Sequence, residues 1–148
     1  MLAIAAISLA ACGPRQIFSA DRPLPGYWTY ADSVVFAYDI ADTSLAYDLE
    51  LTFDHSDAFA AQNLYAEFVT HYPGGATERE PVSIELADKR GTWLGECSGE
   101  DCRLALAIQR GARFPEPGAY GLTLRQYGRS DTLAGIAGIG MRVTVAQR

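Results

Sequence analysis

The sequence has no cluster of positive charge, and this shortage limits what the protein can bind. It contains 12 Lys and Arg residues against 18 Asp and Glu residues, which gives a net charge of −6, and its longest basic run is the pair Lys89-Arg90. An acidic surface repels phosphate groups, so nucleic acid is not an expected partner. The same acidity disfavours electrostatic attachment to anionic lipid, so any membrane attachment must use apolar insertion or a covalent anchor.

Histidine is scarce, and the common catalytic motifs are missing. There are two histidines: His55 is expected at a polar strand end, and His71 on the solvated side of a strand. No Gly-x-Ser-x-Gly elbow, phosphate-binding glycine loop or His-Glu-x-x-His motif occurs. Asp48, Glu50 and Asp54 share one strand face, but a calcium site needs converging loops and not a flat face. We therefore expect no enzymatic activity, no metal and no cofactor.

No apolar run is long enough to cross a bilayer, which takes about 20 residues. Residues 1–12 read MLAIAAISLAAC and are uncharged, which fits the apolar part of a secretory signal. The end of this stretch, Leu9-Ala10-Ala11-Cys12, resembles the bacterial lipobox, in which small residues let the signal peptidase reach the bond before the cysteine. We expect Cys12 to receive a diacylglycerol on its thiol and an acyl chain on its new amine, because two or three chains make a stable anchor.

A positive charge is also missing from the beginning of the chain, since none precedes Arg15. Signal peptides open with Lys or Arg, so we interpret residues 1–11 as a signal segment truncated at its amino terminus. The alternative is a buried strand or helix with an ordinary core cysteine. Residues 12–26, rich in proline and glycine, are predicted to be the lipidated cysteine and a tether, with a short edge strand at 16–19. Residues 27–148 are predicted to form one domain.

Helical periodicity of useful length is absent, and a period of two dominates instead. Apolar and polar residues alternate in the runs 34–40, 47–54, 64–71, 82–87, 104–108, 120–124 and 141–145. Turn signals separate these runs, for example Pro73-Gly74-Gly75 and Pro115-Glu116-Pro117-Gly118, and residues 57–62 could form one helical turn. The pattern predicts an all-β protein, an antiparallel β-sandwich of about seven to nine strands, with either an Ig-like or a jelly-roll topology.

Cysteine is sparse, and its spacing predicts one crosslink. With Cys12 assigned to lipid, Cys97 and Cys102 remain, separated by four residues. An even pair in an exported chain is normally a disulfide, and the two strands of a hairpin would place these cysteines opposite each other. A zinc site is not expected, because no second cysteine pair or nearby histidine completes four ligands. A redox dithiol is not expected either, because the spacing differs from C-x-x-C.

Aromatic residues supply one further binding hypothesis. Tyr27 and Trp28 precede the first long run, and Trp93 lies in a glycine-flanked turn. Exposed rings could stack on sugars or contact a partner protein. In a β-sandwich, however, such tryptophans usually fill the core, and we favour that interpretation.

With these elements in place, the sequence resembles the GldH-type gliding-motility lipoproteins of Bacteroidetes over nearly the whole chain. The resemblance rests on the order and spacing of short motifs: Trp28, Asp32-Ser33-Val34-Val35-Phe36, Asp42, Asn63-Leu64, Leu86-Ala87-Asp88, Gly91-Thr92-Trp93-Leu94-Gly95, Arg113-Phe114-Pro115, Gly118-Ala119-Tyr120, Gln126, Leu133, Gly135-Ile136 and Gly140-Met141-Arg142-Val143. The chain departs from the family pattern at Phe53-Asp54-His55 and Phe59-Ala60-Ala61, and in its Cys97 and Cys102 pair.

The resemblance implies a non-enzymatic lipoprotein of the cell envelope that is required for movement over surfaces. Its expected partners are the membrane, through the lipid, and a protein of the gliding or secretion machinery. Because no acidic residue directly follows Cys12, unlike in surface-exported lipoproteins of the same bacteria, we expect an outer-membrane anchor facing the periplasm. The alternative function is a carbohydrate-binding β-sandwich lipoprotein.

Overall fold

The computed structural model describes residues 13–147, and β-strands make up most of this range. The strands are β1 (Gln16–Pro23), β2 (Tyr27–Thr29), β3 (Val34–Ile40), β4 (Tyr47–Ser56), β5 (Asn63–His71), β6 (Thr77–Glu85), β7 (Glu96–Ser98), β8 (Asp101–Ala112), β9 (Gly118–Gln126), β10 (Thr132–Ala134) and β11 (Ile136–Val145). The predicted all-β class is confirmed, and no helix occurs between residues 13 and 147. Residues 57–62 form a turn instead of the helical turn considered from the sequence.

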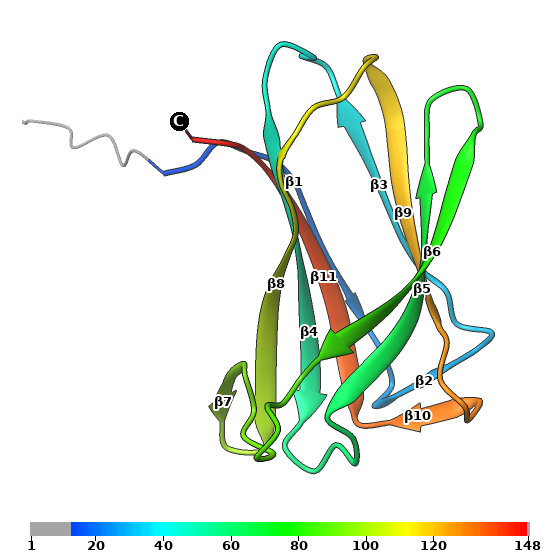
Figure 1. Cartoon of the computed structure of the whole chain (residues 1–148), viewed down its shortest axis with the longest axis vertical. Helices are drawn as coiled ribbons and strands as arrows, with labels where there is room; N and C mark the ends of the chain where they lie inside the picture. Colours follow the sequence, from blue (N-terminus) through cyan, green and yellow to red (C-terminus); the bar gives the residue numbers. More distant parts are fainter. Residues whose placement is uncertain (1–12, 148) are drawn as a thin grey trace, which may run out of the picture.

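The strands form two facing antiparallel sheets, as Figure 1 shows. One sheet has the order β1-β11-β4-β8-β7 and the other has the order β3-β9-β5-β6, while β2 and β10 pair separately at one end. The pairs are nested along the chain: β1 with β11, β2 with β10, β3 with β9, β4 with β8, and β5 with β6. A long hairpin rolled into two sheets in this way is a jelly roll, so the structure selects one of the two predicted sandwich topologies.

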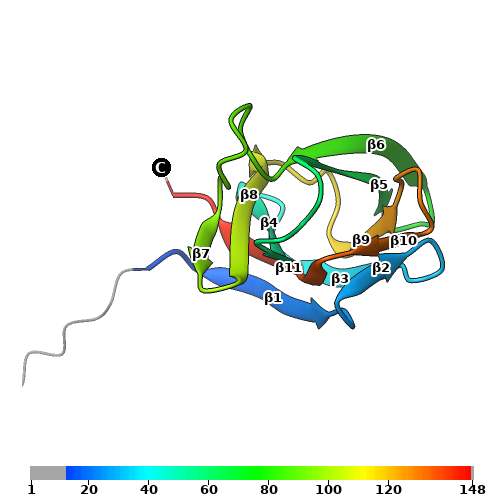
Figure 2. The ribbon, with the colours of Figure 1, turned by 90° about the horizontal axis from the view of Figure 1, so that it is seen from below.

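Alternating residues of both sheets fill the space between them. Figure 2 shows the arrangement of the strands from below. In β3 and β4 the inward side chains are the apolar ones that the period of two identifies, and Phe36, Leu51 and Phe53 are completely buried. Burial of one such side chain is worth about 1.5–3 kcal/mol. The core therefore depends on the same alternation that predicted the strands.

The amino-terminal boundary of the domain differs from the prediction. Residues 16–23 do not belong to a tether, because β1 pairs with β11 from Gln16↔Thr144 to Pro23↔Gly138. Phe18 on β1 points into the sandwich and lies edge-on to Phe36, with 6.5 Å between ring centroids. The proline and glycine content of residues 12–26 favours a tether, yet β1 lies at the edge of its sheet, where Pro23 is tolerated.

The sandwich has two distinct ends. The chain enters β1 and leaves β11 at the same end, which we call the proximal end (Figure 1). The short strands β2, β7 and β10 and the β4–β5 turn lie at the other end, which we call the distal end (Figure 1). The β1 strand runs between the two, and its eight residues span about 26 Å.

Candidate functional site

The proposed lipid attachment point, Cys12, lies outside the described residues. Gly13, Pro14 and Arg15 are exposed and lead directly into β1 at the proximal end. The described part of the chain contains no helix long and apolar enough to span a membrane.

Cys97 and Cys102 form the disulfide that their spacing predicts, at the distal end of the first sheet. They are direct partners in the β7–β8 register, with 4.0 Å between their Cα atoms. The turn between the two strands contains Gly99, whose φ of +63° lies in the left-handed region that glycine adopts without strain. The closed loop is short, so the crosslink contributes about 2 kcal/mol to stability.

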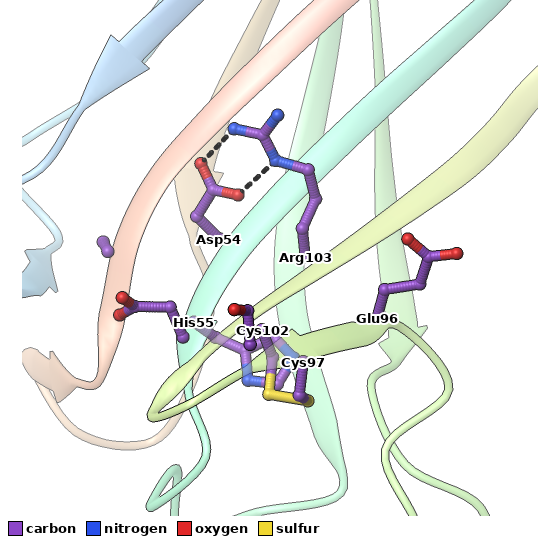
Figure 3. A pocket seen from close by; sticks show the side chains of 9 residues that line it. Asp54, His55, Glu96, Cys97, Cys102 and Arg103 are labelled. Atoms are coloured by element: carbon purple, nitrogen blue, oxygen red, sulfur yellow. Dashed lines mark hydrogen bonds and ion pairs between the residues drawn. A yellow bond between two sulfur atoms is a disulfide. The ribbon is translucent and has the colours of Figure 1, made fainter.

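A depression of about 550 Å³ lies beside this disulfide (Figure 3). Asp54 on β4 and Arg103 on β8 line it and form a bidentate ion pair, with Nε–Oδ1 and Nη2–Oδ2 distances of 2.6 and 3.0 Å. The Asp54 carboxylate raises the pKa of the Arg103 guanidinium by hydrogen bonding and by its charge. Arg103 thus donates one hydrogen bond to each oxygen of the Asp54 carboxylate, which neutralises its charge and fixes its orientation.

His55 lies one residue before the end of β4, as expected, but its side chain is buried instead of lying at a polar surface. Its position continues the inward alternation of β4, and its ring lies 4.7 Å from that of Trp93 between centroids. Nδ1 lies 2.9 Å from the carbonyl oxygen of Ser56, and because a carbonyl only accepts, Nδ1 carries the proton. Nε2 then presents a lone pair without a partner among the described residues. Among residues 13–147 no nucleophile is hydrogen-bonded to this ring, which packs against Trp93 and Phe59 and also lines the 550 Å³ depression.

The other candidate histidine, His71, is half-buried and not freely solvated as expected. Its Nε2 lies 2.9 Å from the Thr123 hydroxyl on the neighbouring strand β9. The acidic residues of the outer face of β4 are likewise engaged: Asp48 accepts a hydrogen bond from the Gly111 amide, and Glu50 lies 3.9 Å from Arg142. Between residues 13 and 147 no three His, Cys, Asp or Glu side chains gather in a way that could hold a metal ion.

The three aromatic residues considered for sugar or partner contact do not form a common surface. Trp28 is fully buried, and its Nε1 donates to the Asp32 carbonyl at 2.6 Å, so its ring cannot contact a ligand. Trp93 is half-buried against the core and His55. Tyr27 is 44% exposed and is therefore the one ring of the three that remains well exposed. β2 has only three residues, which is too short for the sequence to reveal which of its side chains point inward.

A second depression, of about 510 Å³, lies at the distal end and was missed from the sequence. Tyr65 and Tyr127 line it together with Asn63, Arg129, Ser130 and Leu133. Tyr127 directly follows the Ala66↔Gln126 pair of the β5–β9 ladder, and its amide donates to the Tyr65 carbonyl at 3.0 Å. The alternation in β5 predicts that Tyr65 points outward, so this half of the depression could have been found from the sequence. No sequence pattern predicts the loop that brings Arg129 and Ser130 beside it.

Comparison with known proteins identifies one family. The profile of the family described as GldH lipoprotein matches residues 16–143. A gliding motility lipoprotein GldH homolog of Christiangramia forsetii is 22% identical over 145 residues, covering 93% of this chain and 88% of the relative. The gliding motility lipoprotein GldH of Flavobacterium johnsoniae is 22% identical over 150 residues, covering 97% of this chain and 93% of the relative.

Among solved structures, a chain of infectious bursal disease virus strain Gx overlaps 90% of this chain with a TM-score of 0.36 and 20% identity. The overlap covers 30% of the viral chain. We draw nothing from so loose a likeness.

Proposed function

Because the chain belongs to the GldH lipoprotein family, we propose that it is a lipid-anchored envelope protein that supports gliding motility by binding another protein of the motility or secretion machinery. Its role is to hold and position that partner, and it needs no catalytic step of its own. The Asp54 carboxylate is paired with Arg103 and the His55 ring packs against Trp93, and neither side chain is hydrogen-bonded to a nucleophile among the described residues, which agrees with this role.

The observation that carries the proposal is the extent of the family match. Residues 16–143 run from the first residue of β1 to near the end of β11, so the match includes all eleven strands except the last two residues of β11. Both relatives are matched over 88% or more of their own length, and both are named for gliding motility. The motility role is therefore inferred for the complete domain and not for a small shared module.

We propose that the anchor is the acylated thiol and amine of Cys12, with residues 1–11 removed as a signal segment. Since β1 begins at Gln16, the tether is shorter than the sequence suggested. Four residues reach about 14 Å at most when fully extended. The proximal end of the sandwich would then lie close to the membrane, which we place in the outer membrane facing the periplasm, and the distal end would point away from it.

Deleting the gene and scoring colony spreading on agar tests the motility role. We expect the deletion to abolish spreading, the intact gene to restore it, and the Cys12→Ser gene to fail because the protein is no longer held at the membrane. Affinity purification from solubilised envelopes should recover an envelope protein with the wild type and not with an unrelated lipoprotein. A deletion strain that spreads like its parent would contradict the proposal.

Metabolic labelling with a fatty-acid probe tests the anchor separately. We expect label on the wild-type protein and none on Cys12→Ser. The matched control is Cys97→Ser combined with Cys102→Ser, which removes the other two cysteines and should keep the label. Equal labelling of the wild type and Cys12→Ser would refute lipidation at this position.

A further inference from the structure

The distal end concentrates exposed aromatic side chains that the core does not use. Tyr65 and Tyr127 are 51% and 58% exposed, and both line the 510 Å³ depression, which we call the distal cleft. Tyr30, 44% exposed, reaches the same loop and donates from its hydroxyl to the Gly128 carbonyl at 2.6 Å. Tyr127 therefore belongs to the segment 127–131 between β9 and β10, and Tyr30 and Tyr65, from separate parts of the chain, contact this loop.

A buried side chain holds this loop in one conformation. Gln126 is 3% exposed, and its amide nitrogen donates to the carbonyls of Ser130 and Asp131 at 2.6 and 3.1 Å. Its amide oxygen accepts a hydrogen bond from the Gly128 backbone. Both the nitrogen and the oxygen of the Gln126 side-chain amide are thus hydrogen-bonded to the backbone of the loop. A loop fixed in this way can bind a ligand without losing much conformational freedom.

The residues that line the distal cleft combine flat apolar faces with directional donors. Tyr65 and Tyr127 supply rings, and Arg129 and Ser130 supply guanidinium and hydroxyl groups. The Asn63 amide nitrogen donates one hydrogen to the Ser83 hydroxyl and keeps a second hydrogen for a ligand. The volume of the cleft falls within the roughly 300–1,000 Å³ typical of ligand pockets. Sugars present the same combination, because a pyranose ring has an apolar C–H face and a rim of hydroxyl groups.

We propose that the distal cleft binds an uncharged oligosaccharide, with pyranose faces against Tyr65 and Tyr127 and hydroxyl groups hydrogen-bonded by Asn63 and Arg129. Arg129 is the one charged side chain among the described residues that line the cleft, and its guanidinium donates hydrogen bonds to neutral hydroxyl oxygens. The site is separate from the rings first considered for sugar contact, and it does not depend on the motility role proposed above.

The position of the cleft is consistent with a ligand outside the membrane. The cleft adjoins Asn63 at the start of β5 and the end of β9, at the opposite end of the sandwich from the entry of the chain into β1 (Figure 1). With the anchor at the proximal end, the cleft is the part of the domain that faces away from the bilayer. It is therefore accessible to a glycan of the envelope while the lipid remains inserted.

Calorimetric titration of the mature lipoprotein tests the proposal, in a detergent whose headgroup is not a sugar. The probes are cellohexaose, laminarihexaose and chitohexaose, which present uncharged β-linked pyranose rings. We expect at least one of them to bind with a millimolar or lower Kd. Tyr65→Ala and Tyr127→Ala should each weaken that binding about tenfold, because each removes a stacking surface.

Tyr27→Ala is the matched control, because Tyr27 is a similarly exposed tyrosine that does not line the cleft. It should leave the Kd within twofold of the wild type. If an alanine variant melts at a lower temperature, Tyr65→Leu and Tyr127→Leu keep apolar bulk and still remove the ring. The proposal is overturned if none of the three hexasaccharides binds, or if Tyr27→Ala weakens binding as much as the cleft variants do.

Discussion

Replacing Gln126 by leucine would remove the side chain that shapes the loop between β9 and β10 while keeping its volume similar. The change deletes three hydrogen bonds, two donated to the carbonyls of Ser130 and Asp131 and one accepted from Gly128. Each such bond contributes about 0.5–1.5 kcal/mol net, so their loss costs about 3 kcal/mol. Leucine recovers about 1 kcal/mol by burying apolar surface in place of the amide. We expect Gln126→Leu to lower the free energy of unfolding by about 2 kcal/mol.

The corresponding shift in melting temperature follows from the size of the domain. About 135 residues are described, and unfolding entropy is about 2.1 cal/mol/K per residue, so 2 kcal/mol lowers Tm by about 7 °C. Thermal unfolding followed by circular dichroism measures this shift. Hydrogen exchange provides a local measurement, because the Gly128 amide should exchange faster in Gln126→Leu once its acceptor is gone.

Gln109→Leu provides the control, since it makes the same replacement at an exposed position on β8. Its Tm should change by less than about 2 °C, as surface substitutions usually change stability by less than about 0.5 kcal/mol. If Gln126→Leu melts within 2 °C of the wild type and the Gly128 amide exchanges at the wild-type rate, then the side chain does not hold the loop. The argument for a rigid distal cleft would then fail.

Three further outcomes follow from the structure. Replacing both Cys97 and Cys102 by serine should lower the free energy of unfolding in urea by about 2 kcal/mol and leave the far-ultraviolet spectrum unchanged, and a loss near zero would contradict the loop-entropy argument. Burial, and then neighbouring phenols, raise the pKa of Tyr38 to about 12, so its neutral form stabilises the fold below pH 10 and this contribution disappears as the pH rises through 12. As the pH rises from 10 to 12, the free energy of unfolding of the wild type should therefore fall by about 2 kcal/mol more than that of Tyr38→Phe, as measured by chemical denaturation. Equal falls would refute the assignment. Arg103→Ala should lower the free energy of unfolding by at most about 1 kcal/mol, because the ion pair between Arg103 and Asp54 is exposed to solvent. A larger loss in urea denaturation would contradict this.

Strand positions were predictable from sequence because the alternation of burial is a local property. The run 34–40 coincides with β3, and the run 47–54 lies within β4. The first half of β6 was missed, because residues 77–81 are exposed on the edge of the second sheet and do not alternate. Pro81 even argues against a strand there, yet an edge strand tolerates proline where no ladder hydrogen bond is needed.

The pairing of the strands depends on contacts that sequence patterns do not encode. Turn signals mark where strands end but not which strands meet, and β1 pairs with a strand that begins 120 residues later. For this reason the Ig-like and jelly-roll topologies could not be separated in advance. The same limit applies to the distal cleft: Tyr30, Tyr65 and Tyr127 are distant in sequence. The β5–β9 pairing places Tyr127 beside Tyr65, and the loop held by Gln126 brings Gly128 to the Tyr30 hydroxyl.

The antiparallel pairing of β1 and β11 has a mechanical consequence. The lipid would hold the chain just before Gln16, and a partner or glycan at the distal end would pull from the opposite direction. Such a tension acts along β1, so the seven residue pairs that join it to β11 are loaded in shear. In shear the ladder bonds share the load and must break together, whereas in peeling they break one at a time. A protein anchored in this orientation would carry a pull between the membrane and a distal ligand through the whole β1–β11 ladder at once.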